Sequence, residues 1–326
     1  MPSPQLSLHA LQRRLAELLP REAVAIGEGT PLEVTTIAGD APRLIAATML
    51  ERGALRAHRI VDAPVATFAA FLDGTQTSRV VAFPDGVPVV HGTVAAVVRA
   101  RRNRRLVTWR LLVERALYAP RALLAASSWT ALEDSGLRVV DTSDGAVPIA
   151  SPHPFALRDG AVHLVQKDRE RLEAVLAEEW CGRQQEPLLI DGGISGSERV
   201  ASASCVVGVV KSHRTLYAEG EALRAVLSLG VGERSSVFRI TSTRRATVAS
   251  WYLRLRDPRG HDPMWGLVRV EVSAPSLVDD PLIGDRANDV SRWVLAEVSP
   301  LALPDARWDK MVYGVRDCEE FLRAIV

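Results

Sequence analysis

The chain has 326 residues, 47% of them hydrophobic, with 40 basic and 39 acidic side chains. This length is enough to bury a substantial core, in one large domain or two modest ones. The near balance of charge excludes a histone-like binder and an acidic tail, so any argument from charge has to be local.

Three cysteines stand far apart, with neither a CxxC motif nor a nearby pair of histidines. This spacing argues against a disulfide framework and a structural zinc site, and it favours a reducing compartment. No stretch approaches the ~18 uncharged apolar residues that form a transmembrane helix. We therefore expect a soluble, cytoplasmic protein that has no membrane partner.

The N-terminus has the pattern of an amphipathic helix. Leu8, Leu11, Leu15 and Leu18 recur at helical spacing, and charged residues interrupt the stretch in a way that a signal peptide does not allow. We assign residues 1–60 to an N-terminal helical segment. Its apolar helix face would serve dimerisation or the docking of a partner.

The next elements alternate between strands and helices in blocks. Strands are expected at 67–73, 79–83 and 88–100, with a Pro-Asp-Gly turn at 84–86, which together form an antiparallel meander. Residues 106–126 and 168–181 have helical character. Further strands are expected at 186–193, 201–211, 236–241, 246–256 and 266–273, and a helical region at about 285–325.

This order favours a mixed α/β sheet flanked by helices over a doubly wound Rossmann fold, which alternates more strictly. Neither GxGxxG nor GxxxxGK[ST] occurs, so a cradle for nucleotide phosphates has no support.

Two apolar strands end in the same dipeptide, Asp-Gly, at Asp73 and Asp191. Carboxylates at the ends of neighbouring buried strands can converge, and hard divalent cations such as Mg²⁺ and Mn²⁺ prefer oxygen ligands. The glycine after each aspartate would let a nucleic-acid backbone approach closely. The alternative is that both dipeptides are only turns, because Asp-Gly is a common turn sequence.

Several motifs together resemble the NurA domain family. FLDGTQ (71–76) is followed by the meander, and LLIDGGISG (188–196) is followed by Val207-Gly208-Val209-Val210-Lys211. WYLRLRDPRGHDPMWGLVRVEV (251–272) resembles the late pair of strands in that family. The resemblance extends from about residue 65 to the C-terminus, and each motif alone is short.

The resemblance implies that residues 61–326 form a ribonuclease H-like, Piwi-like nuclease domain. It implies a Mn²⁺-dependent (or Mg²⁺-dependent) DNA nuclease that works as a homodimer with the hexameric ATPase HerA on DNA ends, in DNA repair or phage defence. The runner-up is a catalytically weak or inactive subunit that binds DNA or the ATPase as a scaffold.

The family aspartates match Asp73 and Asp191, and the family also has a glutamate on the preceding helix. We select Glu173, which borders the apolar face of that helix. Glu179 is the reserve, and Glu170 and Glu178 are further candidates on the same helix.

The C-terminal motif departs from the family pattern. Ser299 stands at the position of a tyrosine and Arg307 at that of a histidine. Asp309 is our choice for the last metal-binding carboxylate, with Asp305 as the alternative, and Arg307 is a candidate phosphate contact. A degraded metal site that leaves only a scaffolding role stays open.

Basic residues complete the predicted site. Lys211 is expected to neutralise the phosphate that is cut, and the alternative is a surface lysine. One short segment is rich in arginine and is expected to bind a DNA backbone. The alternative is a solvated hairpin end without that role. The arginines are Arg99, Arg101, Arg102, Arg104 and Arg105.

Overall fold

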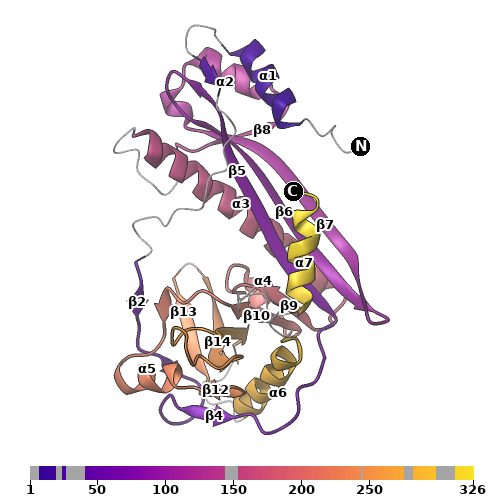
Figure 1. Cartoon of the computed structure of the whole chain (residues 1–326), viewed down its shortest axis with the longest axis vertical. Coiled ribbons are helices and arrows are strands. Elements are labelled where there is room, and N and C mark those ends of the chain that lie inside the picture. The colour runs from indigo at the N-terminus through magenta and orange to yellow at the C-terminus, as the bar shows by residue number, and fades with distance from the viewer. Residues whose placement is uncertain are drawn as a thin grey trace.

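The computed structural model describes residues 7–19, 24–26, 41–143, 153–243, 245–274, 282–298 and 313–326. Within these ranges thirteen strands form one mixed sheet, and helices lie on both of its faces (Figure 1). The predicted fold class, a mixed α/β sheet flanked by helices, is confirmed. No helix in this part of the chain has the length and apolar composition that crossing a membrane requires.

The first long elements form an antiparallel meander, but its strands are not the three that the sequence predicted. Its strands are β5 (Ala70–Pro84), β6 (Val89–Arg102) and β7 (Arg105–Ala119). The strands expected at 67–73 and 79–83 are one continuous strand, because pairing with β6 runs through the residues between them. The predicted turn follows β5, with Asp85 and Gly86 at positive φ values of 53° and 77°.

The helix expected at 106–126 is wrong for most of its length. Residues 105–119 form β7, which pairs with β6 along its whole length. Leu, Arg, Glu and Ala favour a helix, but this preference is at most ~0.7 kcal/mol per residue, and pairing in the hairpin overrides it. Helical turns begin afterwards, at η1 (Arg121–Leu123) and α2 (Ala126–Glu133), before β8 (Arg138–Asp141) pairs with β7.

The next elements complete the core of the fold. They are α3 (Pro154–Arg183), which contains the helix predicted at 168–181, β9 (Leu188–Asp191), α4 (Glu198–Ser202) and β10 (Val206–Val210). β9 pairs parallel with both β5 and β10, which gives the strand order β7–β6–β5–β9–β10. Three antiparallel strands followed by two that run parallel to the first define a ribonuclease H-like core, so this expectation is confirmed.

Antiparallel strands extend the sheet beyond β10. The later elements are β11 (Thr215–Leu216), α5 (Gly220–Leu227), β12 (Glu233–Ser235), β13 (Phe238–Ser242), β14 (Arg245–Arg254), β15 (Leu267–Ser273), α6 (Ile283–Ala296) and α7 (Tyr313–Arg323). β15 pairs with β10, β14 with β15, and β13 with β14. The strands expected at 236–241, 246–256 and 266–273 are therefore present.

Residues 1–60 contain one described helix and four short strands. The helix is α1 (Leu8–Leu18), and β1 (Val24–Ile26) pairs with β5. The strands β2 (Arg43–Leu44), β3 (Thr48–Met49) and β4 (Ala57–Arg59) pair with β11, β13 and β12. β1, β3 and β4 thus join this segment to the large sheet, whereas β2 and β11 form a separate two-stranded sheet. The role of the segment in dimerisation or partner docking stays a prediction.

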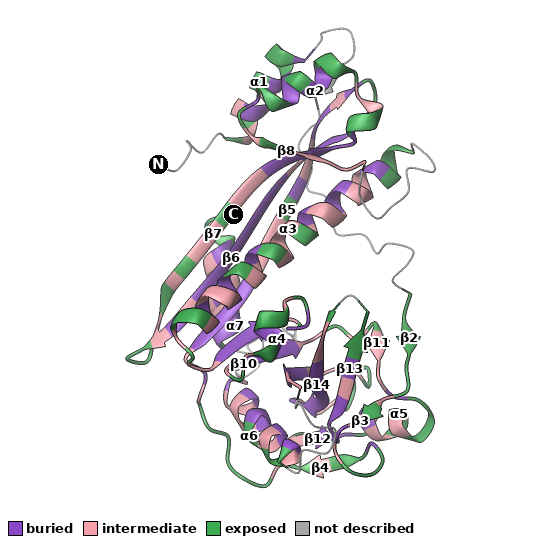
Figure 2. Ribbon diagram, turned by 180° about the vertical axis from the view of Figure 1, so that it is seen from behind, coloured by how far each residue is buried: buried purple, intermediate pink, exposed green. Residues whose placement is uncertain are grey.

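Side chains of the central strands alternate between two core layers. Leu72 packs on the side of α3, in a cluster that includes Leu176. Phe71 packs on the opposite side, in a cluster that includes Val315 of α7. Figure 2 shows β6 mostly buried between its neighbours, and the outer half of β7 half-buried or exposed. Because alternate residues of a strand share a face, Asp73 projects to the α7 side, like Phe71.

Candidate metal centre

The two predicted aspartates lie where β5 and β9 separate. The parallel pairing of these strands ends at Leu72↔Ile190, one residue before Asp73 and Asp191. β5 continues along β6, whereas β9 ends and Gly192 follows with a φ of 139°, a conformation that favours glycine. Both carboxylates therefore stand at a split in the sheet, on the face that α7 covers.

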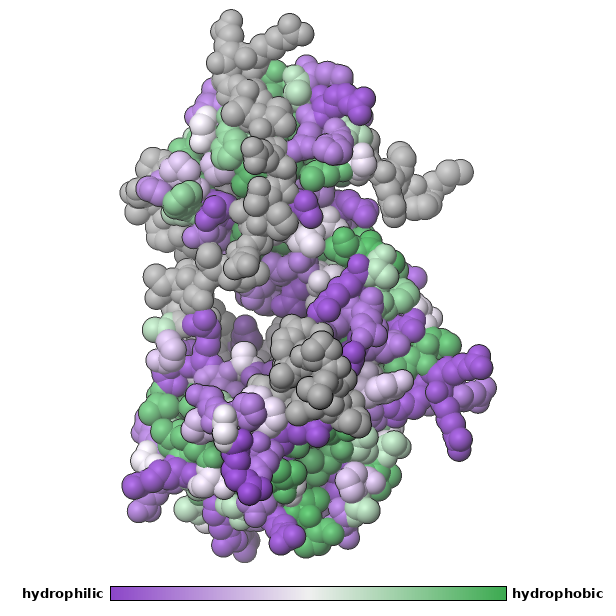
Figure 3. Space-filling view, viewed as in Figure 1, coloured by the Kyte–Doolittle hydropathy of each residue, from purple (hydrophilic) through white to green (hydrophobic). Residues whose placement is uncertain are grey.

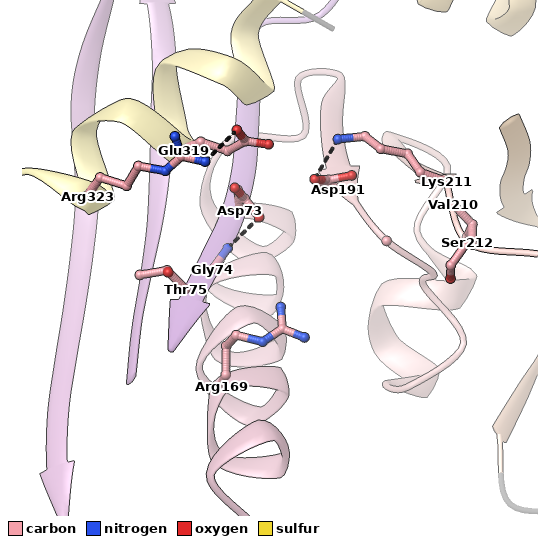
Figure 4. A pocket seen from close by; sticks show the side chains of 11 residues that line it. Asp73, Gly74, Thr75, Arg169, Asp191, Val210, Lys211, Ser212, Glu319 and Arg323 are labelled. Atoms are coloured by element: carbon pink, nitrogen blue, oxygen red, sulfur yellow. Dashed lines mark hydrogen bonds and ion pairs between the residues drawn. The ribbon is translucent and has the colours of Figure 1, made fainter. Parts of the chain in front are cut away.

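A third carboxylate joins them from the C-terminal helix. Carboxylate oxygens of Asp73, Asp191 and Glu319 all lie within 4.8 Å of one another. Figure 4 shows Glu319 reaching from α7 toward Asp73, with Asp191 on the neighbouring strand. This convergence rules out the interpretation of Asp73 and Asp191 as turn residues alone.

Sequence reasoning missed Glu319, although a signal was present. Val315, Cys318 and Leu322 are the buried residues on one face of α7, and Glu319 lies beside that face. A ribonuclease H-like core often takes its last acidic ligand from a C-terminal helix, and on this ground the sequence favours Asp309 or Asp305. The helical period of the final residues would have pointed to Glu319 instead.

Asp73 is buried close to other negatively charged side chains, which changes its pKa. Burial raises the pKa of Asp73 well above its usual value, and the nearby Asp191 and Glu173 carboxylates raise it further. The Gly74 backbone N–H, which donates to Asp73 Oδ1 at 2.8 Å, and the Lys211 ammonium only partly oppose this effect. Buried, mutually repelling oxygen ligands are what a divalent cation would stabilise, so the residues present fit such an ion.

Glu173 approaches this group from the other face of the sheet. A Cβ at position 74 would lie 2.2 Å from Glu173 Oε1, so Gly74 makes room for this glutamate. The space left by Gly74 is therefore filled from within the protein, not left for a nucleic-acid backbone as the sequence suggested. Burial raises the pKa of Glu173 to about 7, although Arg169, which pairs with it, acts in the opposite direction. Glu173 is not one of the three converging carboxylates, and its role as a metal ligand stays a prediction.

The other glutamates of α3 have partners away from the acidic group. Glu170 accepts hydrogen bonds from Gln166 and Lys167, Glu178 accepts one from Ser197, and Glu179 lies 3.7 Å from Arg110. Of the four candidates on this helix, Glu173 is thus the one whose charge acts on Asp73.

Lys211 lies beside the acidic group, as predicted. Its Nζ donates to Asp191 Oδ2 at 2.8 Å, and both side chains are mostly buried. Burial alone would lower the pKa of Lys211, but the Asp191 carboxylate raises it, so the ammonium stays charged.

The three converging carboxylates and Lys211 line a cavity of about 400 Å³. Asp73, Asp191 and Glu319 form its acidic part. The cations on its walls are Lys211, Arg169 and Arg323, the last of which lies 3.6 Å from Glu319 (Figure 4). An acidic centre ringed by cations can hold a positive ion and also attract a phosphate.

The predicted DNA-binding arginines differ in their environments. Arg99 donates to Asp317 of α7 at 2.6 Å and to Thr108 at 2.7 Å, and Arg101 donates to Glu297 at 2.7 Å. These two guanidinium groups therefore join elements of the fold.

Arg102, Arg104 and Arg105 are exposed at the end of the β6–β7 hairpin. Figure 3 shows this end as a hydrophilic projection. Arg102 pairs with Glu186 at 2.9 Å, and Asn103 and Arg104 adopt positive φ values of 51° and 63° in the turn. Contact of this projection with DNA stays a prediction.

The predicted C-terminal motif lies in a part of the chain that the structure does not describe. Ser299, Asp305, Arg307 and Asp309 all lie outside the described residues. Asp309 as a metal ligand and Arg307 as a phosphate contact therefore stay predictions.

Comparisons with known proteins give distant structural similarities. No protein-family model matches the chain, and no curated protein matches it. The NurA nuclease from Sulfolobus solfataricus is similar in structure with a TM-score of 0.47 and 10% identity, over 82% of each chain. The catalytic domain of human Endonuclease V aligns with a TM-score of 0.30 and 16% identity, over 99% of this chain and 96% of that one. Because both likenesses are distant, the chemistry of the cavity has to be derived from its own residues.

Proposed function

We propose that this chain is a metal-dependent nuclease that hydrolyses phosphodiester bonds of DNA. The observation that supports this most directly is the convergence of Asp73, Asp191 and Glu319 within 4.8 Å beside Lys211, at the split of a ribonuclease H-like sheet. The sequence motifs that resemble the NurA family include two of these three carboxylates, Asp73 and Asp191, and the lysine.

The donor set suits Mn²⁺ or Mg²⁺, because all its members are carboxylate oxygens. Asp73, Asp191 and Glu319 would hold one ion, and Glu173, with Asp309 as predicted, would serve a second. When bound, such ions stabilise negative charge on the attacking and leaving oxygens of a phosphodiester.

The chain's own cations position the substrate in this proposal. Lys211 donates to Asp191 and orients its carboxylate, and its ammonium faces the same cavity, where it would offset the charge of the scissile phosphate. Arg169 and Arg323 line other walls of the cavity and add to the positive field around the acidic centre.

The proposed partners come from the sequence resemblance to the NurA family. On this basis we propose that the chain forms a homodimer and works with a HerA-type hexameric ATPase in the cytoplasm, in DNA repair or phage defence. The exposed arginines Arg102, Arg104 and Arg105 would extend the DNA contact away from the cavity, and such contacts would weaken as salt concentration rises.

The test is degradation of linear single- and double-stranded DNA with Mn²⁺. The wild-type chain, alone or with the cognate ATPase, is expected to cut, and EDTA is expected to abolish cutting. Asp73→Ala and Asp191→Ala should each reduce the rate by more than ~100-fold, since each removes several kcal/mol of charge stabilisation.

Asp62→Ala is the matched control, because the Asp62 side chain is 70% exposed and lies outside the cavity. It should cut at the wild-type rate. If the folded wild-type chain does not cut under any of these conditions, the nuclease proposal fails and the scaffold alternative replaces it.

A further inference from the structure

A second cavity, of about 480 Å³, adjoins the acidic one. Lys211 lines both cavities, and the segment that follows β10 contributes Ser212 to the first and His213 and Arg214 to the second. A linear polymer with a phosphate bound at the carboxylates of the first cavity would therefore extend past Lys211 into the second cavity.

The second cavity combines an aromatic wall with a basic one. Trp265, Met264 and Leu216 supply the apolar surface, and Lys211 and Arg214 supply positive charge. The acid on its lining, Asp262, accepts a hydrogen bond from the Met264 N–H at 2.7 Å and so caps its own turn. This pairing of an apolar face with cations is the chemistry that recognises a base together with its phosphate.

Hydrogen bonds and a ring contact hold Trp265 in place. Arg254, which is fully buried, donates to the Trp265 carbonyl at 2.7 Å, and the Trp265 N–H donates to the Asp262 carbonyl at 2.8 Å. The His261 ring stacks on the indole at 4.3 Å, nearly parallel to it. On the neighbouring wall, His213 Nε2 lies 2.9 Å from the Leu267 carbonyl.

A half-exposed tryptophan held in this way is a preformed stacking platform. We propose that the second cavity binds one unpaired nucleotide of the DNA strand, next to the phosphate that is cut. The base stacks on Trp265, and Lys211 and Arg214 accompany its phosphates. The volume lies within the ~300–1,000 Å³ typical of small-ligand sites. This inference rests on the proposed function for its substrate class, and it adds a preference for unpaired DNA.

The test measures binding without cleavage. Fluorescence anisotropy in EDTA compares a ten-residue thymidine strand with a ten-residue abasic strand of equal charge. Trp265→Ala should weaken binding of the base-bearing strand about tenfold, the scale of one stacked base, and leave the abasic strand unchanged. Trp265→Phe should stay within about threefold of the wild type, because phenylalanine also stacks.

Phe155→Ala is the control, since Phe155 is 61% exposed and lies on α3 outside both cavities. It should bind both strands like the wild type. Equal losses on both strands in Trp265→Ala, no loss on either, or no binding of the thymidine strand by the wild type would each overturn the inference. A chain that cuts DNA but shows one of these results retains the proposed function without the nucleotide cavity. If the chain binds the base-bearing strand through Trp265 but does not cut DNA, the nucleotide cavity stands and the proposed nuclease function fails.

Discussion

At the residue scale, single glycines decide how closely the acidic groups approach. Gly74 leaves the space that Glu173 occupies, and Gly208 faces the Gly192 carbonyl, where a Cβ would lie 2.7 Å from the oxygen. Gly208 therefore lets the loop after Asp191 fold back over β10. The Asp-Gly dipeptides are thus part of the packing of the centre, and a larger residue at position 74 would displace a carboxylate.

Glu319 and Glu320 offer a matched pair of variants on α7. Glu319 is one of the three converging carboxylates, whereas Glu320 is 61% exposed and pairs with Arg316. At Mn²⁺ concentrations of ~100 times Kd, the wild type should gain ~2.7 kcal/mol in its free energy of unfolding. Glu319→Gln should lose most of this gain and most of the cutting activity, because it removes an anionic ligand.

Glu320→Gln should keep both the Mn²⁺-dependent gain and the activity. Thermal unfolding with and without Mn²⁺ measures the gain, and the DNA assay measures the rate. An undiminished response to Mn²⁺ in Glu319→Gln would exclude this residue as a ligand.

At the scale of elements, α7 carries Glu319, one of the three converging carboxylates, and contacts with neighbouring strands hold this helix in place. Gly314 packs directly on the Phe71 ring, where a Cβ would lie 2.3 Å from the nearest ring carbon, and the Cys318 thiol lies 3.5 Å from the Phe71 carbonyl. The Arg99 guanidinium stacks over the Phe321 ring at 4.7 Å and pairs with Asp317. The position of Glu319 therefore depends on β5 and β6, which also hold Asp73.

Arg99→Ala should loosen this helix. It removes hydrogen bonds from a mostly buried guanidinium to Asp317 and Thr108, so the free energy of unfolding should fall by about 2 kcal/mol. Urea denaturation measures the loss, and Mn²⁺ affinity should fall with it. Arg102→Ala, in the same hairpin but 45% exposed, should change stability by less than ~0.5 kcal/mol. Equal stability of the two variants would contradict this role for Arg99.

At the scale of the whole molecule, stability should respond to pH through His91. Burial lowers the pKa of His91 to about 4, and the nearby Arg115 and Arg79 charges act in the same direction. The unfolded chain takes up this proton near pH 6.5 and the folded chain only near pH 4. The free energy of unfolding should therefore fall between pH 6.5 and pH 4, by at most ~3 kcal/mol, and this contribution is constant above that window.

His91→Gln isolates this effect from the other titrating groups. Urea denaturation at several pH values should give a flatter profile for the variant between pH 6.5 and pH 4 than for the wild type. Parallel profiles for the two proteins would show that His91 does not titrate differently in the folded state.

The sequence predicted those elements and site residues that depend on neighbouring residues, and it failed where contacts between distant parts of the chain decide the structure. The turn after β5, the helical period within α3 and the end of β9 at Asp191 carry local signals of period and turn chemistry, and these were correct. The strand expected to end at Asp73 instead continues to Pro84. β7 was mistaken for a helix, because its pairing with β6 decides its conformation and its own residues do not. The helical period of the final residues places Glu319 beside the buried face of α7, but its proximity to Asp73 arises from the packing of α7 against β5, which the period alone does not encode.

The order in which the acidic residues occur along the chain has a consequence for synthesis. Glu319 follows Asp73 by 246 residues (319 − 73), and α7 comes after every strand of the sheet. A nascent chain therefore carries two of the three carboxylates long before the third leaves the ribosome, and domains generally fold as their residues emerge. The acidic centre is therefore completed only after the strands that carry Asp73 and Asp191 have been synthesised.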